Sequence, residues 1–202
     1  MKRLNILLIF IFMMGIWVKM PIQLKAQAKF KATKVEMKVK GTSNLHDWDM
    51  DVKSVQTEAL VQIETDAITL NQGKLRLNVK DIVSGNSSMD KKAHGALKAD
   101  KNPQIEFVIS KPVVLKSNGK GFNGNISGQL MLAGVKKEIA VPVQLSVNGS
   151  NQIVIEGSKT LDMKEFQMDP PTAIMGTVKA GNIVEVVFTV EMNKDNTITL
   201  NQ

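Results

Sequence analysis

The chain of 202 residues contains no cysteine and no tyrosine, only two histidines, and 4% aromatic residues in all. Without cysteine, a thiol nucleophile, a thiolate metal site and a disulfide bond are excluded. The lipid-modified cysteine that ends a lipoprotein signal is excluded for the same reason. A Gly-x-Ser-x-Gly nucleophile turn and a phosphate-binding P-loop are also missing. The fold must therefore be held by its core, without covalent cross-links.

Residues 1–28 are typical of a secretory signal peptide. A basic start at Lys2 and Arg3 precedes an apolar run from Leu4 to Val18, and Ala26-Gln27-Ala28 supplies a cleavage signal of small residues. The alternative is a membrane anchor, but the apolar run is shorter than the roughly 20 residues that a spanning helix needs. We therefore expect cleavage after Ala28 and an exported protein, located in the periplasm or outside the cell.

Residues 29–202 have the length of one domain and carry little net charge. Removal of the first 28 residues takes away four of the 26 basic residues and none of the 19 acidic ones, which leaves a net charge of +3. The lysines are scattered among acidic residues instead of forming the basic stripe of a nucleic-acid-binding protein. Nucleic acid is therefore excluded as a partner.

Apolar and polar residues alternate along most of the chain, which is the period-two pattern of strands with one buried face. The alternating runs are Val35–Lys40, Leu75–Val79, Ile126–Leu132, Val141–Val147, Ile153–Gly157 and Val184–Met192. Turn sequences typical of hairpins occur at Lys116–Gly121, Asn148–Asn151 and Ala180–Asn182. The pattern predicts an all-β, mostly antiparallel fold that forms either a closed barrel or a sandwich.

One short helix interrupts the strands. It is predicted to begin at Ser87, because Ser87 and Asp90 have the spacing of a capping box, and Pro103 limits its length. Helical spacing places apolar side chains on one side of it, at Met89, Ala93, Ala96 and Leu97. Polar side chains share the other side, at Asp90, Lys91, His94 and Lys98. This polar side faces either solvent or the mouth of a barrel.

A bend is predicted just before Trp48. Apolar residues occupy odd positions through Val35, Met37, Val39 and Leu45 but even positions from Trp48 onward, and a strand cannot change sides without a bulge or bend. The change falls within Thr42–Asp47, which places His46 near a rim or corner and returns Trp48 to the core. Since neighbouring residues of a strand point to opposite faces, the adjacency of His46 and Asp47 is no evidence of a catalytic hydrogen bond.

Four stretches together carry a family resemblance. They are KGTSNLHDWDM (40–50), SGNSSMDKKAHGALKADKNPQIEF (84–107), GQLMLAGVKKEIAVPV (128–143) and PPTAIMGTVKAGNIVEVVF (170–188). In this order they resemble the YceI-like family, and the resemblance covers nearly all of residues 29–202. It implies an exported, eight-stranded antiparallel, lipocalin-like β-barrel with one short helix. It also implies an apolar interior that holds a polyisoprenoid or another long amphiphile.

The residues expected to line this cavity are Met37, Val39, Trp48, Leu77, Phe107, Leu130, Met175 and Phe188. Composition alone fits a packed core equally well, and it is the resemblance that favours a cavity. Met175 follows a segment opened by Pro170 and Pro171, which serves either as a lid or as a rigid connection into a strand near Thr177.

The resemblance places the polar end of the ligand near the barrel opening. The matching positions are His46, Asp47, Ser84, Asn86, Asp90 and His94, with Lys91, Lys92 and Lys98 as charge partners for a pyrophosphate. For each of these residues, a purely structural role stays open as an alternative. Asp90 and His94 would form an exposed helix pair, His46 would tie down the bend, and the lysines would be a solvated surface.

The sequence thus predicts an exported carrier that binds a long-chain isoprenoid, such as an isoprenoid quinone or a polyprenyl phosphate, or a fatty-acyl lipid. No covalent chemistry and no cofactor are expected. One alternative is a metal-dependent hydrolase that uses His46, Asp47 and His94, although their spacing matches no metal motif. Another is a structural or stress-related barrel without ligand. The protein could also contact a membrane transiently or pair with a second copy of itself, but no residue in the sequence identifies a surface for either.

Overall fold

The computed structural model describes residues 27–149 and 152–195, so nearly all of the predicted signal peptide lies outside the described residues. The strands are β1 (Ala28–Ser43), β2 (Trp48–Val52), β3 (Gln56–Ile63), β4 (Ala67–Asn78), β5 (Ile82–Val83), β6 (Gln104–Ile109), β7 (Val113–Ser117), β8 (Phe122–Leu132), β9 (Val135–Val147), β10 (Ile153–Asp162), β11 (Thr172–Ala173) and β12 (Val178–Lys194). The described helices are α1 (Ser87–Ala96) and the short turns η1 (Val79–Asp81), η2 (Met163–Phe166) and η3 (Ile174–Gly176).

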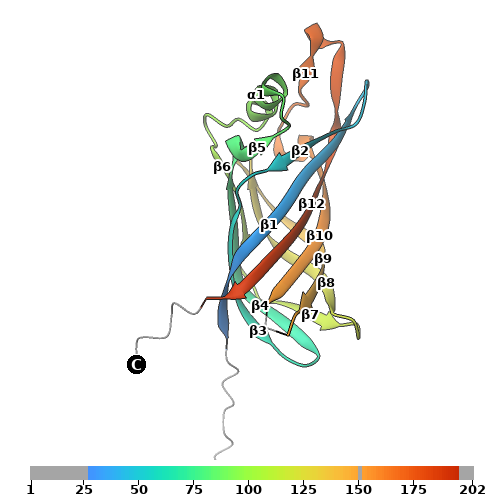
Figure 1. Ribbon diagram of the computed structural model, residues 1–202. Coiled ribbons are helices and arrows are strands. Elements are labelled where there is room, and N and C mark those ends of the chain that lie inside the picture. Colours follow the sequence, from blue (N-terminus) through green and yellow to red (C-terminus); the bar gives the residue numbers. More distant parts are fainter. Residues whose placement is uncertain (1–26, 150–151, 196–202) are drawn as a thin grey trace, which may run out of the picture.

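The strands close into a tall barrel (Figure 1). Within the described residues, eight antiparallel strand positions follow one another around it: β1, β2 with β3, β4, β6 with β7, β8, β9, β10 and β12. Pairing of β1 with β12, from Phe30 opposite Lys194 to Ser43 opposite Ala180, completes the circle. The prediction of an eight-stranded antiparallel barrel is confirmed, and the sandwich alternative is wrong because the sheet closes on itself.

The wall of the barrel is interrupted between β9 and β10. These strands pair only from Val143 opposite Gly157 to Val147 opposite Ile153. The next residue of β9 toward its beginning is Pro142, which has no N–H group to donate to a ladder. There is therefore no ladder of backbone hydrogen bonds between residues 135–142 of β9 and residues 158–162 of β10. We call this interval the lateral seam.

Two of the three predicted turns fall between strands. Lys116–Gly121 joins β7 to β8, and Asn148–Asn151, of which residues 150–151 are not described, joins β9 to β10. The turn predicted at Ala180–Asn182 is wrong, because these residues lie inside β12. The register shifts there, so that Gly41 and Ser43 of β1 face Val184 and Ala180. Pairing with β1 holds this Gly-containing stretch as a bulge in a continuous strand.

The predicted bend before Trp48 is confirmed. β1 ends at Ser43 and β2 begins at Trp48. The Ser43 hydroxyl donates a hydrogen bond to the carbonyl oxygen of His46 (2.7 Å) and accepts one from its backbone N–H (3.0 Å). The indole N–H of Trp48 donates to the carbonyl oxygen of Thr42 (2.8 Å). These bonds fix the corner where the strand changes sides.

Helix α1 lies across one end of the barrel, beside β5 (Figure 1). Asn86 caps it, because its side-chain oxygen accepts hydrogen bonds from the N–H groups of Ser88 and Met89. The prediction that Ser87 begins a capping box is therefore wrong. As predicted, Met89, Ala93 and Leu97 turn inward and pack on the core at this end.

The core forms two clusters along the barrel. In one, Phe30, Ile68, Leu115, Leu145 and Ile153 are each at most 2% exposed. The other lies toward α1 and includes Met50, Val79, Leu132, Phe166 and Val184. Figure 1 shows both described chain ends and the β3–β4 and β7–β8 hairpins at the end of the barrel opposite α1.

Candidate ligand-binding cavity

An apolar cavity of about 210 Å³ lies inside the barrel. Inward-facing residues of β1, β4, β6, β8 and β12 line it, among them five of the residues expected from the sequence: Met37, Leu77, Phe107, Leu130 and Phe188. Most of the remaining lining consists of Val, Leu, Ile, Ala and Met. Such a lining suits an apolar chain.

A second apolar cavity of about 100 Å³ lies beneath α1. Val39 and Trp48, also expected at the cavity, line this space together with Ala93 and Leu97 of the helix region. Leu132, Leu161 and Val186 line both cavities. The two spaces therefore adjoin, and together they reach the lower end of the roughly 300–1,000 Å³ typical of ligand pockets.

Two glycines explain why aromatic rings leave this space open. A methyl group on Gly128 would lie 2.7 Å from the ring of Phe107, and one on Gly157 would lie 2.8 Å from the ring of Phe188. Both distances are shorter than van der Waals contact allows. Each ring therefore occupies the space beside a glycine of a neighbouring strand, which leaves room for the cavity.

Met175 does not line the cavity, so this prediction is wrong. It lies in η3, beyond β11, and its side chain is fully exposed. β11 pairs with β12 through Thr172 opposite Lys179 and Ala173 opposite Val178. The segment after the two prolines is thus a short hairpin that projects from the barrel, which holds Met175 away from the interior.

Sequence reasoning missed the charged residues that border the main cavity, of which Lys159 is the most informative. On β10 the inward positions are Ile153, Ile155 and Gly157, and the next one in the alternation is Lys159. The period-two pattern that identified the strand would have found this lysine, had it been followed two residues further. Its ammonium group has no ion pair or hydrogen bond within the described part of the chain.

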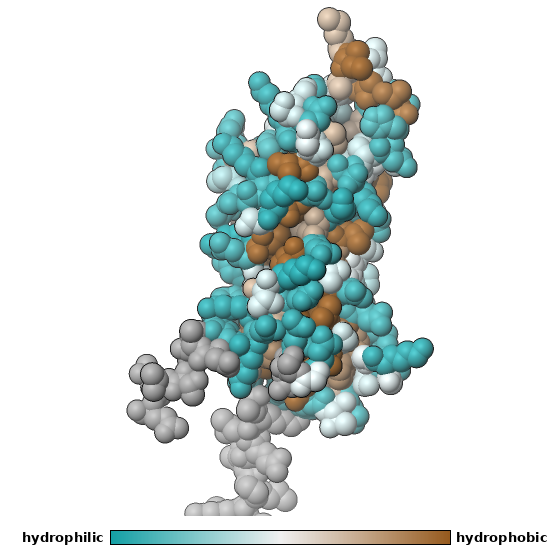
Figure 2. All heavy atoms as spheres, viewed as in Figure 1, coloured by the Kyte–Doolittle hydropathy of each residue, from teal (hydrophilic) through white to brown (hydrophobic). Residues whose placement is uncertain are grey.

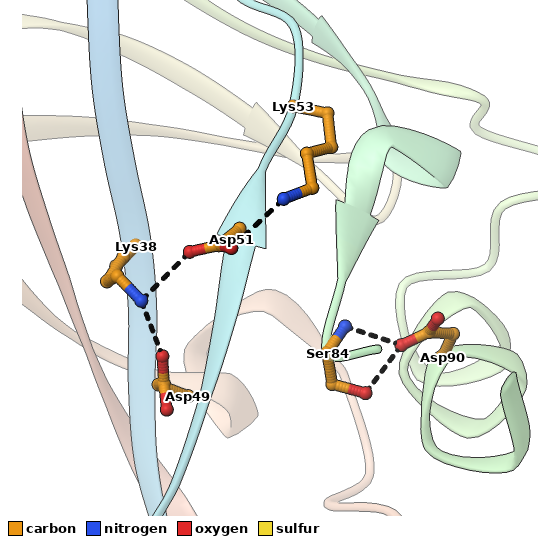
Figure 3. A network of polar contacts seen from close by, with 6 residues as sticks. All are labelled: Lys38, Asp49, Asp51, Lys53, Ser84 and Asp90. Carbon is orange, nitrogen blue, oxygen red and sulfur yellow. Dashed lines mark hydrogen bonds and ion pairs between the residues drawn. The ribbon is translucent and has the colours of Figure 1, made fainter. Parts of the chain in front are cut away.

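Three of the residues expected at the ligand head group, Ser84, Asn86 and Asp90, come together at the start of α1. Asp90 accepts hydrogen bonds from the backbone N–H and the hydroxyl of Ser84, both at 2.7 Å (Figure 3). The Ser84 hydroxyl bond and then its backbone bond hold the pKa of the Asp90 carboxyl below its usual value. Asn86 in turn donates its N–H to the Ser84 hydroxyl (3.2 Å). These contacts anchor the helix to the segment after β5.

The two histidines both contact backbone carbonyl oxygens. His94 Nε2 lies 2.8 Å from the carbonyl oxygen of Ile82, and His46 Nδ1 lies 2.6 Å from that of Asp47. Since a carbonyl oxygen only accepts, each of these nitrogens carries the proton. His46 and Asp47 are exposed in the bend, and no hydrogen bond or ion pair among the described residues joins them to the Ser84–Asp90 group.

The expected head-group residues on α1 face away from the apolar cavities. Asp90, Lys91, His94 and Lys98 border a wide depression on the outer side of the helix, which shares no lining residue with either cavity. Two of the lysines donate to carbonyl oxygens elsewhere: Lys92 to Thr172 (2.7 Å) and Lys98 to Gln167 (2.9 Å). They tie the helix region to Gln167, just after η2, and to Thr172 of β11.

A second polar network lies on the outside of the barrel, next to the bend. Lys38 of β1 contacts Asp49 (2.8 Å) and Asp51 (2.9 Å) of β2, and Asp51 also contacts Lys53 (3.0 Å; Figure 3). The bonds to Asp49 and Asp51 raise the pKa of Lys38, and Lys38 lowers the pKa of Asp51. These exposed groups link the two strands and take no part in the cavity.

Within residues 27–149 and 152–195, no three His, Asp or Glu side chains come together as a metal ion would require. His46, Asp47 and His94 therefore do not form the site that the metal-dependent alternative needs. Among the described helices, none has the length and apolar character to cross a lipid bilayer.

A closed antiparallel barrel with an apolar interior and a short helix over one end defines a small-molecule-binding β-barrel class of fold. The family model of the YceI-like domain matches residues 25–192. The chain belongs to the YceI-like family.

Solved structures share this fold at low sequence identity. BcnA from Burkholderia cenocepacia is 16% identical, with a TM-score of 0.60 over 78% of this chain and 95% of its own. A polyisoprenoid binding domain from Saccharophagus degradans is 10% identical, with a TM-score of 0.59 over 84% and 100%. The YceI protein of Campylobacter jejuni is 15% identical, with a TM-score of 0.53 over 72% and 84%. Among curated proteins, no sequence matches this chain.

Proposed function

We propose that the protein is an exported carrier that holds a long-chain isoprenoid or a similar amphiphilic lipid inside its barrel and does not change it covalently. The observation that carries this proposal is the pair of adjoining apolar cavities, which share Leu132, Leu161 and Val186. A structure named for polyisoprenoid binding, from Saccharophagus degradans, has the same fold and agrees with the proposal.

The shape of the interior favours a flexible chain. The two cavities adjoin between the barrel wall and α1 and hold about 210 and 100 Å³. An apolar tail placed there gains about 25 cal/mol for each Å² removed from water, so a long chain needs few polar contacts. Polyprenyl phosphates, isoprenoid quinones and fatty-acyl lipids all contain such a tail. Methionines such as Met37 and Met192 let the lining adapt to it.

We also propose that the protein contacts membranes transiently through the side chains of Leu45, Ile174 and Met175, which we call the apolar tip. They are 65%, 70% and 105% exposed. Figure 2 shows hydrophobic atoms on the projecting segment at the α1 end of the barrel. Large apolar side chains that project from a surface fit the interfacial region of a lipid bilayer.

Hydrogen bonds hold the apolar tip in place. Asn44 joins its two segments, because its side-chain N–H donates to the carbonyl oxygen of Thr177 and its side-chain oxygen accepts from Lys179, each at 2.8 Å. Ile174 and Met175 have positive φ angles of 48° and 53°, which residues other than glycine rarely adopt. Such backbone strain clusters at functional sites, which supports a role for this display.

The carrier proposal is tested by native mass spectrometry of the protein purified from the exported fraction of its own host, followed by organic extraction. We expect one isoprenoid or acyl lipid for each barrel, released by the solvent and identified by its mass. Recovery from this fraction would also support the signal-peptide prediction. A barrel that is empty in several preparations would contradict the proposal.

A further inference from the structure

Three charged residues border the main cavity in the described part of the chain: Glu58, Lys74 and Lys159. The first two are neutralised by partners. Glu58 pairs with Lys29 at 2.7 Å, and Lys74 pairs with Glu106 at 2.8 Å. Lys159 has no such partner among the described residues. The cavity therefore carries one unbalanced positive charge.

Lys159 lies where the two cavities adjoin. Its cross-strand partner on β12 is Val186, and its inward neighbour on β10 is Leu161. Both of these residues line the main cavity and the cavity beneath α1. On its other side, the ring of Phe188 covers Gly157. The lysine thus interrupts an apolar part of the cavity wall, next to residues that line both cavities.

The position is also close to water. Lys159 belongs to the lateral seam, the interval in which β9 and β10 have no ladder with each other. Its side chain is half-buried, as are Ile139 and Leu161 on the two sides of the seam. An ammonium group here keeps part of its hydration, whereas one enclosed in an apolar interior would lose it at great cost.

We infer that Lys159 is the counter-charge for an acidic head group, so that the ligand is a long apolar chain that ends in a phosphate or a carboxylate. An anion at the seam would accept a charge-assisted hydrogen bond from the ammonium group while its tail follows the cavities. The inference rests on the proposed carrier function and narrows it: a polyprenyl phosphate or a fatty acid is favoured over a quinone, whose head group is neutral.

The test compares farnesyl phosphate with farnesol, which share one isoprenoid tail, by isothermal titration calorimetry on protein expressed from the full-length sequence. We expect the wild type to prefer the phosphate by at least about tenfold, the typical effect of a hydrogen bond to a charged group. Lys159→Gln should lose this preference and bind farnesol as before. Lys159→Arg, which keeps the charge, should retain part of it.

Lys136→Gln is the matched control, because Lys136 is an exposed lysine on β9 that does not line the cavity. It should bind both compounds as the wild type does. If Lys159→Gln still prefers the phosphate, the inference is wrong, while binding of farnesol would continue to support the carrier. If the wild type binds neither compound, the proposed function itself fails.

Discussion

At the scale of single residues, the open interior depends on where aromatic rings are placed. Phe107 and Phe188 are large enough to fill the centre of an eight-stranded barrel. Each instead lies over a glycine of an adjacent strand, Gly128 and Gly157, because no Cβ atom stands in the way. The space they leave is bordered by small or branched residues such as Val141.

An enlarged side chain distinguishes a cavity from a packed core. Val141→Phe should place its ring in the cavity, change the free energy of unfolding by less than about 1 kcal/mol, and weaken farnesol binding at least tenfold. Val61→Phe is the matched control, since Val61 is 1% exposed and lines neither of the two apolar cavities. Overpacking there should cost about 1–3 kcal/mol.

Urea unfolding measures both stabilities and calorimetry measures binding. Equal destabilisation by the two substitutions would mean that the barrel is packed around Val141 as tightly as around Val61. Unchanged farnesol affinity in a stable Val141→Phe protein would place the ligand elsewhere.

The alternation of apolar and polar residues predicts which side of a strand faces inward. It identified some of the cavity residues correctly and failed for others. Met37, Leu77 and Leu130 follow from parity and do line the cavity. Lys159 also lies at an inward position of its strand, but because it is charged, a search for alternating apolar residues does not identify it as facing the cavity. Met175 follows no strand pattern, and its exposure depends on the hairpin that β11 forms with β12. That pairing is not encoded in local periodicity.

At the scale of elements, helix α1 is fixed to the barrel by polar contacts at its start and apolar contacts along one side. Asn86 caps it, and Asp90 accepts two hydrogen bonds from Ser84. The sequence predicted the apolar stripe and the polar stripe, because helical spacing is local. Which stripe covers the cavity depends on tertiary packing, and the polar one proved to face outward.

The bonds from Ser84 to Asp90 predict a pH-dependent contribution to stability. Because they lower the pKa of Asp90 in the folded state, the contribution is present above the unfolded pKa of about 3.9 and is lost as pH falls through the lower folded value. Asp90→Asn should reduce the free energy of unfolding by about 1 kcal/mol at pH 7, since the site is only partly shielded from water.

Urea unfolding of both proteins from pH 7 down to the acid limit checks this. The difference between wild type and Asp90→Asn should shrink below about pH 4. Asp100→Asn, which removes an exposed carboxylate of the same region, should have no effect at any pH. A difference that persists unchanged in acid would rule out the charged Asp90 as its cause.

At the scale of the whole molecule, the two ends of the barrel differ. The end with the described chain termini is packed by side chains such as Phe30, Leu115 and Leu145, which water hardly reaches. The other end carries α1, the smaller cavity and the apolar tip. The carrier proposal therefore predicts that a lipid enters at the helix end, where the apolar cavities come nearest to the side chains proposed to touch a bilayer.

This orientation predicts that membrane binding depends on the apolar tip and not on apolar exposure in general. A variant with Leu45, Ile174 and Met175 all changed to Ser should bind phosphatidylglycerol vesicles at least tenfold more weakly in co-sedimentation, because burial of each side chain contributes on the order of 1 kcal/mol. Val114→Ser is the control, since Val114 is 54% exposed on β7, near the opposite end. It should sediment with vesicles as the wild type does. Equal loss in both variants, or vesicle binding that survives removal of the tip, would mean that the barrel meets the bilayer through another surface.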